Sequence, residues 1–545
     1  MLPLYSFFSF CLVAVNSVQA QYIPTDTQAL TIKEIEHYYL DAATNGFFSA
    51  ITPCTNYQDP TAPAPDNTLG MQTAAEWIRT AFHDFVTGSI FTGLGGLDAS
   101  IGFETGRREN VGAAFNDALL FFSFFYNAQV SMADLIALGV VTSVANCGGP
   151  KVPMKVGRVD ATAAGPSGVP EPETSISDTL NEFNTAGFND GDTVTLTACG
   201  HSMGGVHRNI FPQVVPASAI GPNNADGRVP FDETVAVFDV TTVNDYVHWT
   251  GAKGGPLVTT TNKTVQSDLR LYTYDNNQTI TQLSQSSAYF QSQCQGVMQR
   301  MIELVPYSVR LSAPIDPTTT TNLKPAAIYL SVDWKGNMAL SGFMRYVQVA
   351  GAAAPPGTLK ITLIGRNGQT TAISATGTMS ASDTGTGIWG PTRSYPFTLS
   401  FPATTGLGGI SVSGQTFSFQ DTMFVVPGMS NFSPTPPTFS TTSSLNTVST
   451  YTVNITVAYL TTAPPASLTA TFNIPVPQAG TVSPTISTST TATLQKIGTV
   501  GPFTIFSVIT SKSLSAKQVY GTSVDVAAPG QAAGVKFFKP FNKAA

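Results

Sequence analysis

Charged side chains are scarce in this chain. Only 11% of its 545 residues are Asp, Glu, Lys or Arg, whereas soluble domains average about 25%. The balance is acidic, with 33 acidic against 26 basic residues and a formal net charge of −7. Because a phosphate backbone repels net negative charge, a nucleic-acid partner is disfavoured. The length predicts two or three domains, each large enough for its own core.

Long apolar runs are missing beyond Ala20. The nearest later candidate, residues 119–144, is interrupted by an Asn, a Gln, a Ser and an Asp, so no membrane span is expected. Residues 1–20 are apolar and end in Val18-Gln19-Ala20, a pattern typical of a secretion signal. We therefore expect a secreted, extracellular protein that is soluble or held only by its partners.

Cysteine is also rare. Four of the five cysteines lie beyond the predicted signal, at Cys54, Cys147, Cys199 and Cys294, an even number that suits two disulfides in an oxidising compartment. Four cysteines allow three pairings, of which we favour Cys54 with Cys147 and Cys199 with Cys294. Glycosylation motifs, which fit secretion, stand at Asn262, Asn277, Asn431 and Asn454.

The pattern of apolar residues changes near residue 310. Before it, they recur at helical spacing in residues 32–40, 73–86, 113–126, 131–144, 175–184 and 289–304. After it come short runs rich in Val, Ile, Thr, Phe and Tyr, which are typical of antiparallel β-sandwiches. We predict a multidomain chain: a signal peptide over 1–20, a mainly α-helical domain over 21–310, and an all-β region over 311–545 with one or two sandwiches. Residues 433–444, rich in Pro, Ser and Thr, are a candidate linker between two β units or an exposed loop within one.

Residues 76–84 carry the first chemical signal. On a helix, Arg79 and His83 lie on one face at i, i+4 spacing, with Phe82 beside them. A neutral imidazole can move a proton between the two oxygens of a peroxide, and a guanidinium can stabilise the negative charge that develops as the bond breaks. The competing interpretation is a core helix with one structural histidine and a surface ion pair.

A second signal is the loop that follows. Asp98 and Ser100 stand at alternate positions in a Gly-bearing segment that contains Gly96, and oxygen ligands of this kind suit a hard cation such as Ca2+. Asp84, which leaves the face of Arg79 and His83, could complete the site. Alone, such a loop is more often an ordinary turn.

Several separated motifs, in order, resemble the plant, fungal and bacterial haem peroxidase superfamily, and most closely its secreted fungal (class II) members. The resemblance covers about residues 30–305. It rests on the following segments: Arg79-x-x-Phe82-His83-Asp84, Gly96-x-Asp98-x-Ser100, Glu104 with Asn110, Val130–Leu135, Gly157–Thr162, Gly168–Pro172, Ala198–Ser202 and Pro230–Asp239. It implies a helical fold that binds one haem b and two Ca2+ ions.

On the distal side of the haem, the resemblance implies that Asn110 accepts a hydrogen bond from the far nitrogen of His83, and that Glu104 holds Asn110 in place. Gly96, Asp98 and Ser100 would bind the distal Ca2+ together with Asp84.

On the proximal side, the resemblance implies that His201 is the axial ligand of the haem iron and that Pro170 lies in a segment at the haem edge. An aspartate should accept from the other nitrogen of His201. Asp275 is the predicted match, one residue displaced by an apparent insertion. The proximal Ca2+ would be bound by Ser202, Asp232, Thr234, the Val237 carbonyl and Asp239.

The implied activity is reduction of hydrogen peroxide through a ferryl state, followed by single-electron oxidation of a small reducing substrate. Ligninolytic relatives carry a tryptophan five residues before the proximal histidine, where this chain has Leu196. Of the three acids that bind Mn(II) in other relatives, only Glu76 is matched, since the other positions hold Gln72 and His207. These departures favour a generic, low-potential peroxidase that acts on phenols or similar donors.

Two other functions compete with this one. Gly200-His201-Ser202-Met203-Gly204 satisfies the G-x-S-x-G pattern of α/β-hydrolases, with residues 192–197 as the preceding strand and Ser202 as the nucleophile of an esterase. The second is a non-catalytic surface protein whose β region contacts polysaccharide or the cell wall, in which Trp334 and Trp389 are either core or ligand-stacking residues. Neither explains Arg79 and His83.

Overall fold

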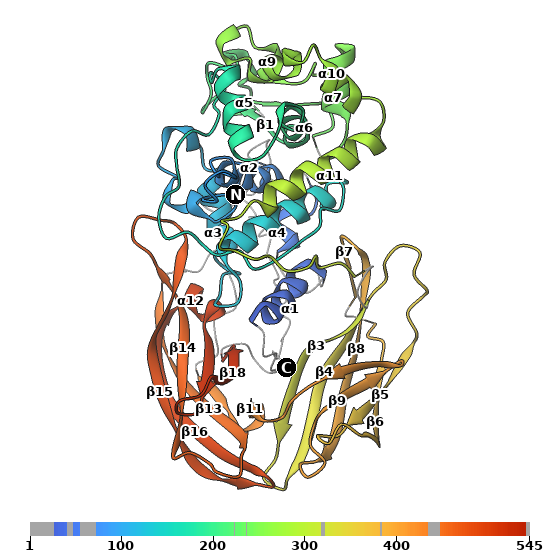
Figure 1. Cartoon of the computed structure of the whole chain (residues 1–545), viewed down its shortest axis with the longest axis vertical. Helices are drawn as coiled ribbons and strands as arrows, with labels where there is room; N and C mark the ends of the chain where they lie inside the picture. Colours follow the sequence, from blue (N-terminus) through green and yellow to red (C-terminus); the bar gives the residue numbers. More distant parts are fainter. Residues whose placement is uncertain are drawn as a thin grey trace, which may run out of the picture.

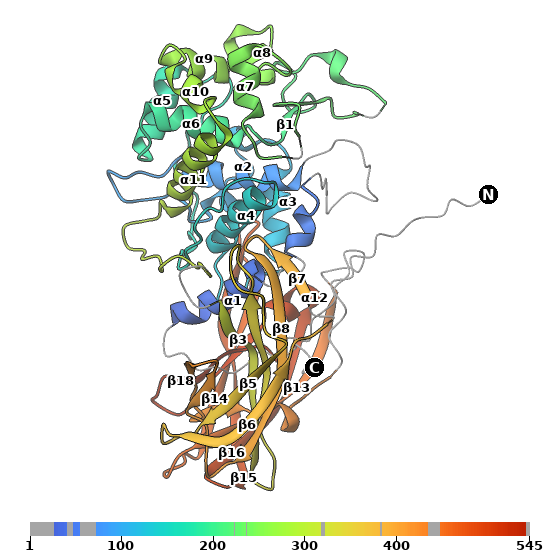
Figure 2. The same cartoon turned by 90° about the vertical axis from the view of Figure 1, so that its right-hand side faces the viewer.

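The computed structural model of the chain describes residues 27–40, 47–54, 72–222, 224–235, 237–317, 322–381, 384–433 and 447–540. The predicted signal and residues 434–444 of the candidate linker lie outside this set. Figures 1 and 2 show a helical part at one end of the molecule and two groups of strands at the other.

Helices dominate up to Glu303. They are α1 (Thr27–Leu40), α2 (Thr73–Phe85), α3 (Ala114–Phe122), α4 (Met132–Asn146), α5 (Ile176–Thr185), α6 (Asp190–Gly200), α7 (Thr241–His248), α8 (Pro256–Thr259), α9 (Ser267–Tyr274), α10 (Gln278–Leu283) and α11 (Ser287–Glu303). Short 3-10 helices are η1 (Phe48–Ile51), η2 (Ser100–Phe103), η3 (Arg108–Asn110), η4 (Ala217–Ala219) and η5 (Lys263–Val265), and the strands β1 (Gly205–His207) and β2 (Arg228–Pro230) form a small antiparallel pair. Each of the six segments predicted as helical overlaps one of these helices.

Polar residues fix where several of these helices begin. The Ser131 hydroxyl accepts the Asp134 amide at the start of α4 (3.1 Å), as Ser175 does for α5, which satisfies donors that the helix itself leaves unpaired. Asn189 opens α6 with a capping box. Helix α2 is itself buried along most of its length and contacts α3, α4, α6 and α11, so it lies at the centre of the helical core.

The β-rich region begins with a two-layer antiparallel sandwich. One sheet has the order β3-β4-β8-β7 and the other the order β10-β9-β5-β6. Alternate apolar residues, among them Leu340, Tyr395, Ile361 and Ile410, fill the space between them. The strands are β3 (Leu323–Val332), β4 (Asn337–Val347), β5 (Thr358–Ile364), β6 (Thr370–Thr378), β7 (Thr384–Gly387), β8 (Gly390–Pro402), β9 (Gly409–Val412) and β10 (Gln415–Ser418).

The second β unit is one antiparallel sheet curled around its own core. Its order is β11-β13-β16-β15-β14-β17-β18, with β12 beside β13, and Val453, Phe472 and Val526 lie inside. A Cβ on Gly534 of β18 would lie 2.9 Å from the Met423 sulfur of β11, so the two edge strands meet. The elements are β11 (Met423–Val425), η6 (Pro427–Met429), β12 (Asn431–Ser433), β13 (Val448–Leu460), β14 (Ser467–Pro477), β15 (Pro484–Val500), β16 (Phe503–Ser515), α12 (Ala516–Gly521), β17 (Ser523–Ala527) and β18 (Ala533–Phe538).

This arrangement confirms the predicted fold class, a helical part followed by an all-β region. The predicted boundary at residue 310 falls between the end of α11 and the start of β3. Only the first β unit is a sandwich, because the strands of the second pair into a single sheet.

Helix α1 joins the two β units to the helical part (Figure 1). Its buried Glu36 pairs with Lys324 of β3 (2.5 Å) and Arg345 of β4 (3.0 Å), and its buried Glu34 pairs with Lys539 beyond β18. Apolar residues of the β region, including Val347, Trp389 and Ile486, pack into or against the helical core. The parts therefore share a buried junction. Among the described residues, no helix is both long and apolar enough to cross a membrane.

Candidate active site

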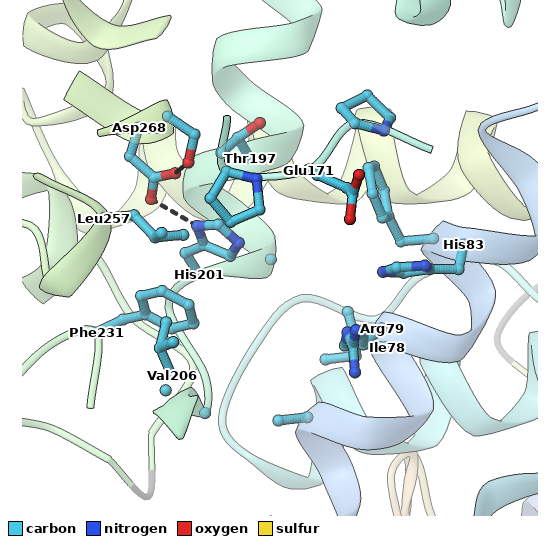
Figure 3. A pocket seen from close by; sticks show the side chains of 18 of the residues that line it. Ile78, Arg79, His83, Glu171, Thr197, His201, Val206, Phe231, Leu257 and Asp268 are labelled. Carbon is cyan, nitrogen blue, oxygen red and sulfur yellow. Dashed lines mark hydrogen bonds and ion pairs between the residues drawn. The ribbon is translucent and has the colours of Figure 1, made fainter. Parts of the chain in front are cut away.

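A cavity of about 280 Å³ separates α2 from the end of α6. Arg79, Phe82 and His83 of α2 line one wall, and Leu196 of α6 and His201 line the other. Figure 3 shows the two imidazoles on opposite sides of this space. The structure thus brings together the two histidines that the sequence singled out.

His201 is held by a buried carboxylate. Its Nδ1 lies 2.7 Å from Oδ2 of Asp268, whose side chain is only 1% exposed, and the Ser267 hydroxyl donates to the other carboxylate oxygen (3.0 Å). The Phe231 ring stacks on the imidazole at 4.1 Å between centroids. Since Asp268 occupies Nδ1 and orients the ring, Nε2 remains for a ligand in the cavity.

The prediction of Asp275 as the partner of His201 is wrong. Asp275 instead accepts the amides of Gln278 (2.9 Å) and Thr279 (2.8 Å) at the start of α10. Asp268 stands earlier in the chain, in the first turn of α9. An acid directly after Ser267 at a helix start was the available signal.

His83 is oriented by an amide. Asn110 donates through Nδ2 to the main-chain carbonyl of Glu104 (3.0 Å), which turns its Oδ1 toward Nδ1 of His83 (2.8 Å). An amide oxygen can only accept, so Nδ1 carries the proton and Nε2 is the basic nitrogen. Burial, and then the charge of Arg79, hold the pKa of His83 well below 6.5, which keeps the ring neutral.

Glu104 supports Asn110 through its backbone alone. Its carboxylate accepts the Gly165 amide (2.7 Å) and pairs with Arg107 (3.2 Å). The sequence prediction that Glu104 holds Asn110 did not distinguish these two parts of the residue.

Arg79 lies against Phe115 and remains a cation. Its guanidinium is 4.5 Å from the Phe115 ring centroid and donates to the Val111 carbonyl (3.2 Å). Burial lowers the pKa of Arg79 to about 10, still above neutral pH. A positive charge therefore stands beside the neutral base at the cavity wall.

The predicted distal cation loop folds around Asp84. The Asp84 carboxylate accepts the amides of Asp98 (3.0 Å), Ala99 (2.8 Å) and Ile101 (2.9 Å) and, at 3.4 Å, the hydroxyl of Ser100. Burial, and then the charge of Asp98, raise the pKa of Asp84 well above its usual value. A cation would relieve this repulsion. Gly96 has a φ of +100°, and a Cβ there would meet the Leu304 carbonyl at 2.5 Å.

The predicted proximal cation loop is also compact. The Thr234 hydroxyl donates to Asp239 (3.1 Å), and the Thr234 amide donates to Asp232 (2.9 Å). Burial raises the pKa of Asp232 to about 7, and its second carboxylate oxygen has no hydrogen-bond partner in the described part of the chain. Val237 is exposed and Ser202 is fully buried.

No group of three or more His, Cys, Asp or Glu side chains that could hold a metal ion occurs among the described residues. Each of the two predicted ligand sets contains only two carboxylates, Asp84 with Asp98 and Asp232 with Asp239, and a cation there would also need hydroxyl and carbonyl oxygens.

The geometry around Ser202 does not favour an esterase. Its hydroxyl donates to the Cys199 carbonyl (2.8 Å), and within the described ranges no hydrogen bond joins it to a histidine. Residues 192–197, the strand that this interpretation requires, lie in helix α6.

Other residues that the sequence singled out also line the cavity: Gln72, Glu76, Pro170 and His207. The side chain of Gln72 is engaged by the backbone, since it donates to the carbonyls of Cys54 (2.7 Å) and Val235 (3.0 Å) and accepts the Gly204 amide (3.1 Å). The favoured disulfides are confirmed: Cys54 pairs with Cys147 and Cys199 with Cys294. Trp389 packs at the junction under Lys151, whereas Trp334 is 58% exposed.

Comparison with known proteins fits this geometry. Residues 64–287 match the family model described as Peroxidase. They form a peroxidase-family domain. The chain is 33% identical over 135 residues to a putative L-ascorbate peroxidase 6 of Arabidopsis thaliana, which covers 24% of this chain and 41% of that protein. It is 30% identical over 180 residues to ligninase LG3 of Phanerodontia chrysosporium, which covers 30% of this chain and 44% of the ligninase.

A longer match reaches beyond the peroxidase domain. The chain is 42% identical over 377 residues to a WSC domain-containing protein of Arthroderma benhamiae, which covers 67% of this chain and 49% of that protein. Because this match is longer than the part of the chain that precedes the predicted β region, the similarity continues into that region. The chain spans less than half the length of each of these three relatives.

Proposed function

We propose that this protein is a secreted haem peroxidase, which reduces hydrogen peroxide and oxidises small phenolic or similar donors one electron at a time. The observation that carries the proposal is the pair of histidines on opposite walls of one cavity, His201 held by the carboxylate of Asp268 and His83 by the amide of Asn110. The apolar segment that ends at Ala20, the glycosylation motifs and the disulfides support secretion.

The residues on the α6 side fit a haem. Nε2 of His201 would hold the iron, while the Asp268 carboxylate fixes the ring and increases its basicity. Phe231 stacks on the imidazole and Leu196 gives the wall an apolar surface. When bound, the haem supplies the redox chemistry that amino-acid side chains lack.

The residues on the α2 side would handle the proton of the peroxide. Nε2 of His83 accepts a proton from one peroxide oxygen and returns it to the other, because Asn110 keeps that nitrogen unprotonated at rest. Arg79 stabilises the negative charge on the departing oxygen. Phe82, beside His83, is an apolar part of the same wall.

The proposed class of reducing substrate follows from two features of other peroxidases that this site lacks, a tryptophan near the proximal histidine and a set of acids for Mn(II). Leu196 stands where ligninolytic relatives carry tryptophan, and this side chain cannot pass an electron. Gln72 brings no negative charge for Mn(II), and three hydrogen bonds to the backbone already fix its amide. Small donors at the haem edge, near Pro170, therefore fit better than bulky high-potential substrates or Mn(II).

We further propose that the two loops bind Ca2+, one through Asp84, Gly96, Asp98 and Ser100, the other through Ser202, Asp232, Thr234, Val237 and Asp239. The elevated pKa values of Asp84 and Asp232 support this, because an oxygen-liganded cation would stabilise both carboxylates in their charged form.

The deciding experiment is an absorption spectrum of the purified protein before and after one equivalent of hydrogen peroxide. A Soret band that shifts with peroxide and returns on addition of a phenol is expected. A colourless protein that cannot be reconstituted with haem would refute the proposal.

A contact with polysaccharide is a second proposal, and it rests on the exposed Trp334 at the turn between β3 and β4. Stacking on a sugar ring needs such an accessible aromatic face. Full-length protein should be retained on insoluble glucan or chitin, and Trp334→Ala should lose this retention. Equal retention of the wild type and Trp334→Ala would refute this second proposal.

A further inference from the structure

The turn between β14 and β15 rests on the distal side of the peroxidase domain. The amide of Val482 donates to the carbonyl of Gly102 (3.1 Å) in η2, and Figure 1 shows this end of the curled sheet reaching the helical part. A Cβ on Gly102 would lie 2.6 Å from the Ser483 hydroxyl oxygen and 2.7 Å from that of Thr481. The turn therefore sits directly on the glycine.

Hydrogen bonds connect η2 to the proposed base. Ile101, beside Gly102, donates its amide to Asp84 (2.9 Å), the residue that follows His83. The Ile101 carbonyl accepts the Glu104 amide (3.0 Å), and the Glu104 carbonyl accepts from Asn110 (3.0 Å), which orients His83. A shift of η2 would therefore move both supports of His83: Asp84, which follows it in the chain, and Asn110, which orients its imidazole.

We propose that Gly102 is a positioning residue, and that through it the β region holds the Asn110 and Asp84 supports of His83 in place. The β region then supports the distal wall from behind, although none of its described residues lines the cavity. The proposal rests on the proposed function only in taking His83 as the proton acceptor, because the contacts exist whatever the reaction is.

The chain offers a matched set of variants. Gly102→Ala introduces the clash without backbone strain, because the φ of Gly102 is not positive. Gly106→Ala makes the same change in the next turn of the chain, where nothing lies within 4 Å and φ is also not positive. Thr481→Ala with Ser483→Ala removes both hydroxyls, after which the nearest atom to the new methyl is the Ser483 Cβ at 3.3 Å.

Hydrogen exchange of residues 97–111 in the full-length protein is the first measurement. Gly102→Ala should speed exchange there roughly tenfold, since overpacking a tight contact costs of the order of a factor of ten or more in local stability. Exchange in α9, which holds Asp268, should not change. Gly106→Ala should behave as wild type, and the triple variant, which combines Gly102→Ala with Thr481→Ala and Ser483→Ala, should recover the wild-type rate.

The second measurement is the ring proton on Nδ1 of His83 in 15N-histidine-labelled protein, which reports the bond to Asn110. Gly102→Ala should make this proton exchange faster with water, and the triple variant should restore it. The positioning role is overturned if Gly102→Ala leaves this proton and residues 97–111 unchanged, or if Gly106→Ala perturbs them equally. Both readouts are independent of peroxide turnover, so the proposed function can fail while this inference stands.

Discussion

Replacing Asp268 tests the proximal side of the site most directly, because the sequence favoured a different aspartate. Asp268 is buried and bonds Nδ1 of His201 at 2.7 Å. A hydrogen bond to a charged group contributes about 1.5–3 kcal/mol, and loss of such a partner behind a metal-binding histidine lowers metal affinity about 10–100-fold. Asp268→Ala should therefore weaken haem binding by about that factor.

Asp275→Ala is the matched control. This carboxylate caps α10 through the amides of Gln278 and Thr279, so its loss should cost about 1 kcal/mol of stability and leave haem affinity unchanged. The assay is titration of each apoprotein with haem, followed by the Soret band, together with a thermal melt of the apoprotein.

Asp268→Ala should bind haem weakly, whereas Asp275→Ala should bind haem normally and melt at a lower temperature. If Asp275→Ala weakens haem binding as much as Asp268→Ala does, the observed geometry of His201 is not the one that holds the cofactor. If neither variant affects binding, the hydrogen bond from Asp268 to His201 does not support the cofactor.

Three further predictions concern other parts of the molecule. His83→Leu should slow the reaction with peroxide by roughly 10²–10⁴-fold, measured by stopped-flow absorbance, while haem stays bound; a near-normal rate would contradict its role as the base. Chelation of Ca2+ should lower the melting temperature, in part because Asp84 and Asp98 then repel each other, and Asp84→Asn should remove that part of the response and leave the part due to the Asp232 loop; a response equal to that of the wild type would show that no ion binds at Asp84. Burial opposes ionisation of Glu34, but Lys539 and then His37 outweigh it and lower its pKa to about 2 from 4.5, so its stabilising contribution is complete above about pH 4.5 and is lost as the pH falls toward 2. The melting temperatures of wild type and Glu34→Gln should therefore converge over this interval, and a constant difference down to pH 2 would refute the assignment.

Local patterns made much of the helical part predictable. Ser131 and Ser175 cap helices at positions where short-range hydrogen bonding decides the outcome. The curled sheet was not predictable in the same way, because its order is set by pairings between strands distant in sequence, such as β14 with β17. Apolar alternation reveals that a strand has a buried face but not which strand lies beside it.

In the site too, contacts between residues close in the sequence were predictable and contacts between distant residues were not. Arg79 and His83 lie four residues apart on α2, and this spacing was sufficient to predict that they share a face, whereas the contact of Asn110 with His83 was implied only by the resemblance to the peroxidase superfamily. Asp268 was missed because its position depends on the path of the chain from β2 to α9, where loops and short helices can shift any count of residues. The role of Glu104 was only half visible, since a sequence cannot show that a carbonyl rather than a carboxylate makes the bond.

Several of the few charged residues in the chain lie at the junction around α1. Glu34 and Glu36 are buried there with Arg345 and Lys539, and Glu36 also pairs with the half-buried Lys324, so some of the few charges in the chain bind its parts together. Buried pairs contribute little net stability, but leaving one member unpaired costs about 3–5 kcal/mol. If residues 311–545 were separated from α1, three cations would lose their carboxylates, and Ile486 and Trp389 would lose apolar neighbours. We infer that these pairs fix how the two β units sit on the peroxidase domain, which in turn keeps the β14–β15 turn on Gly102.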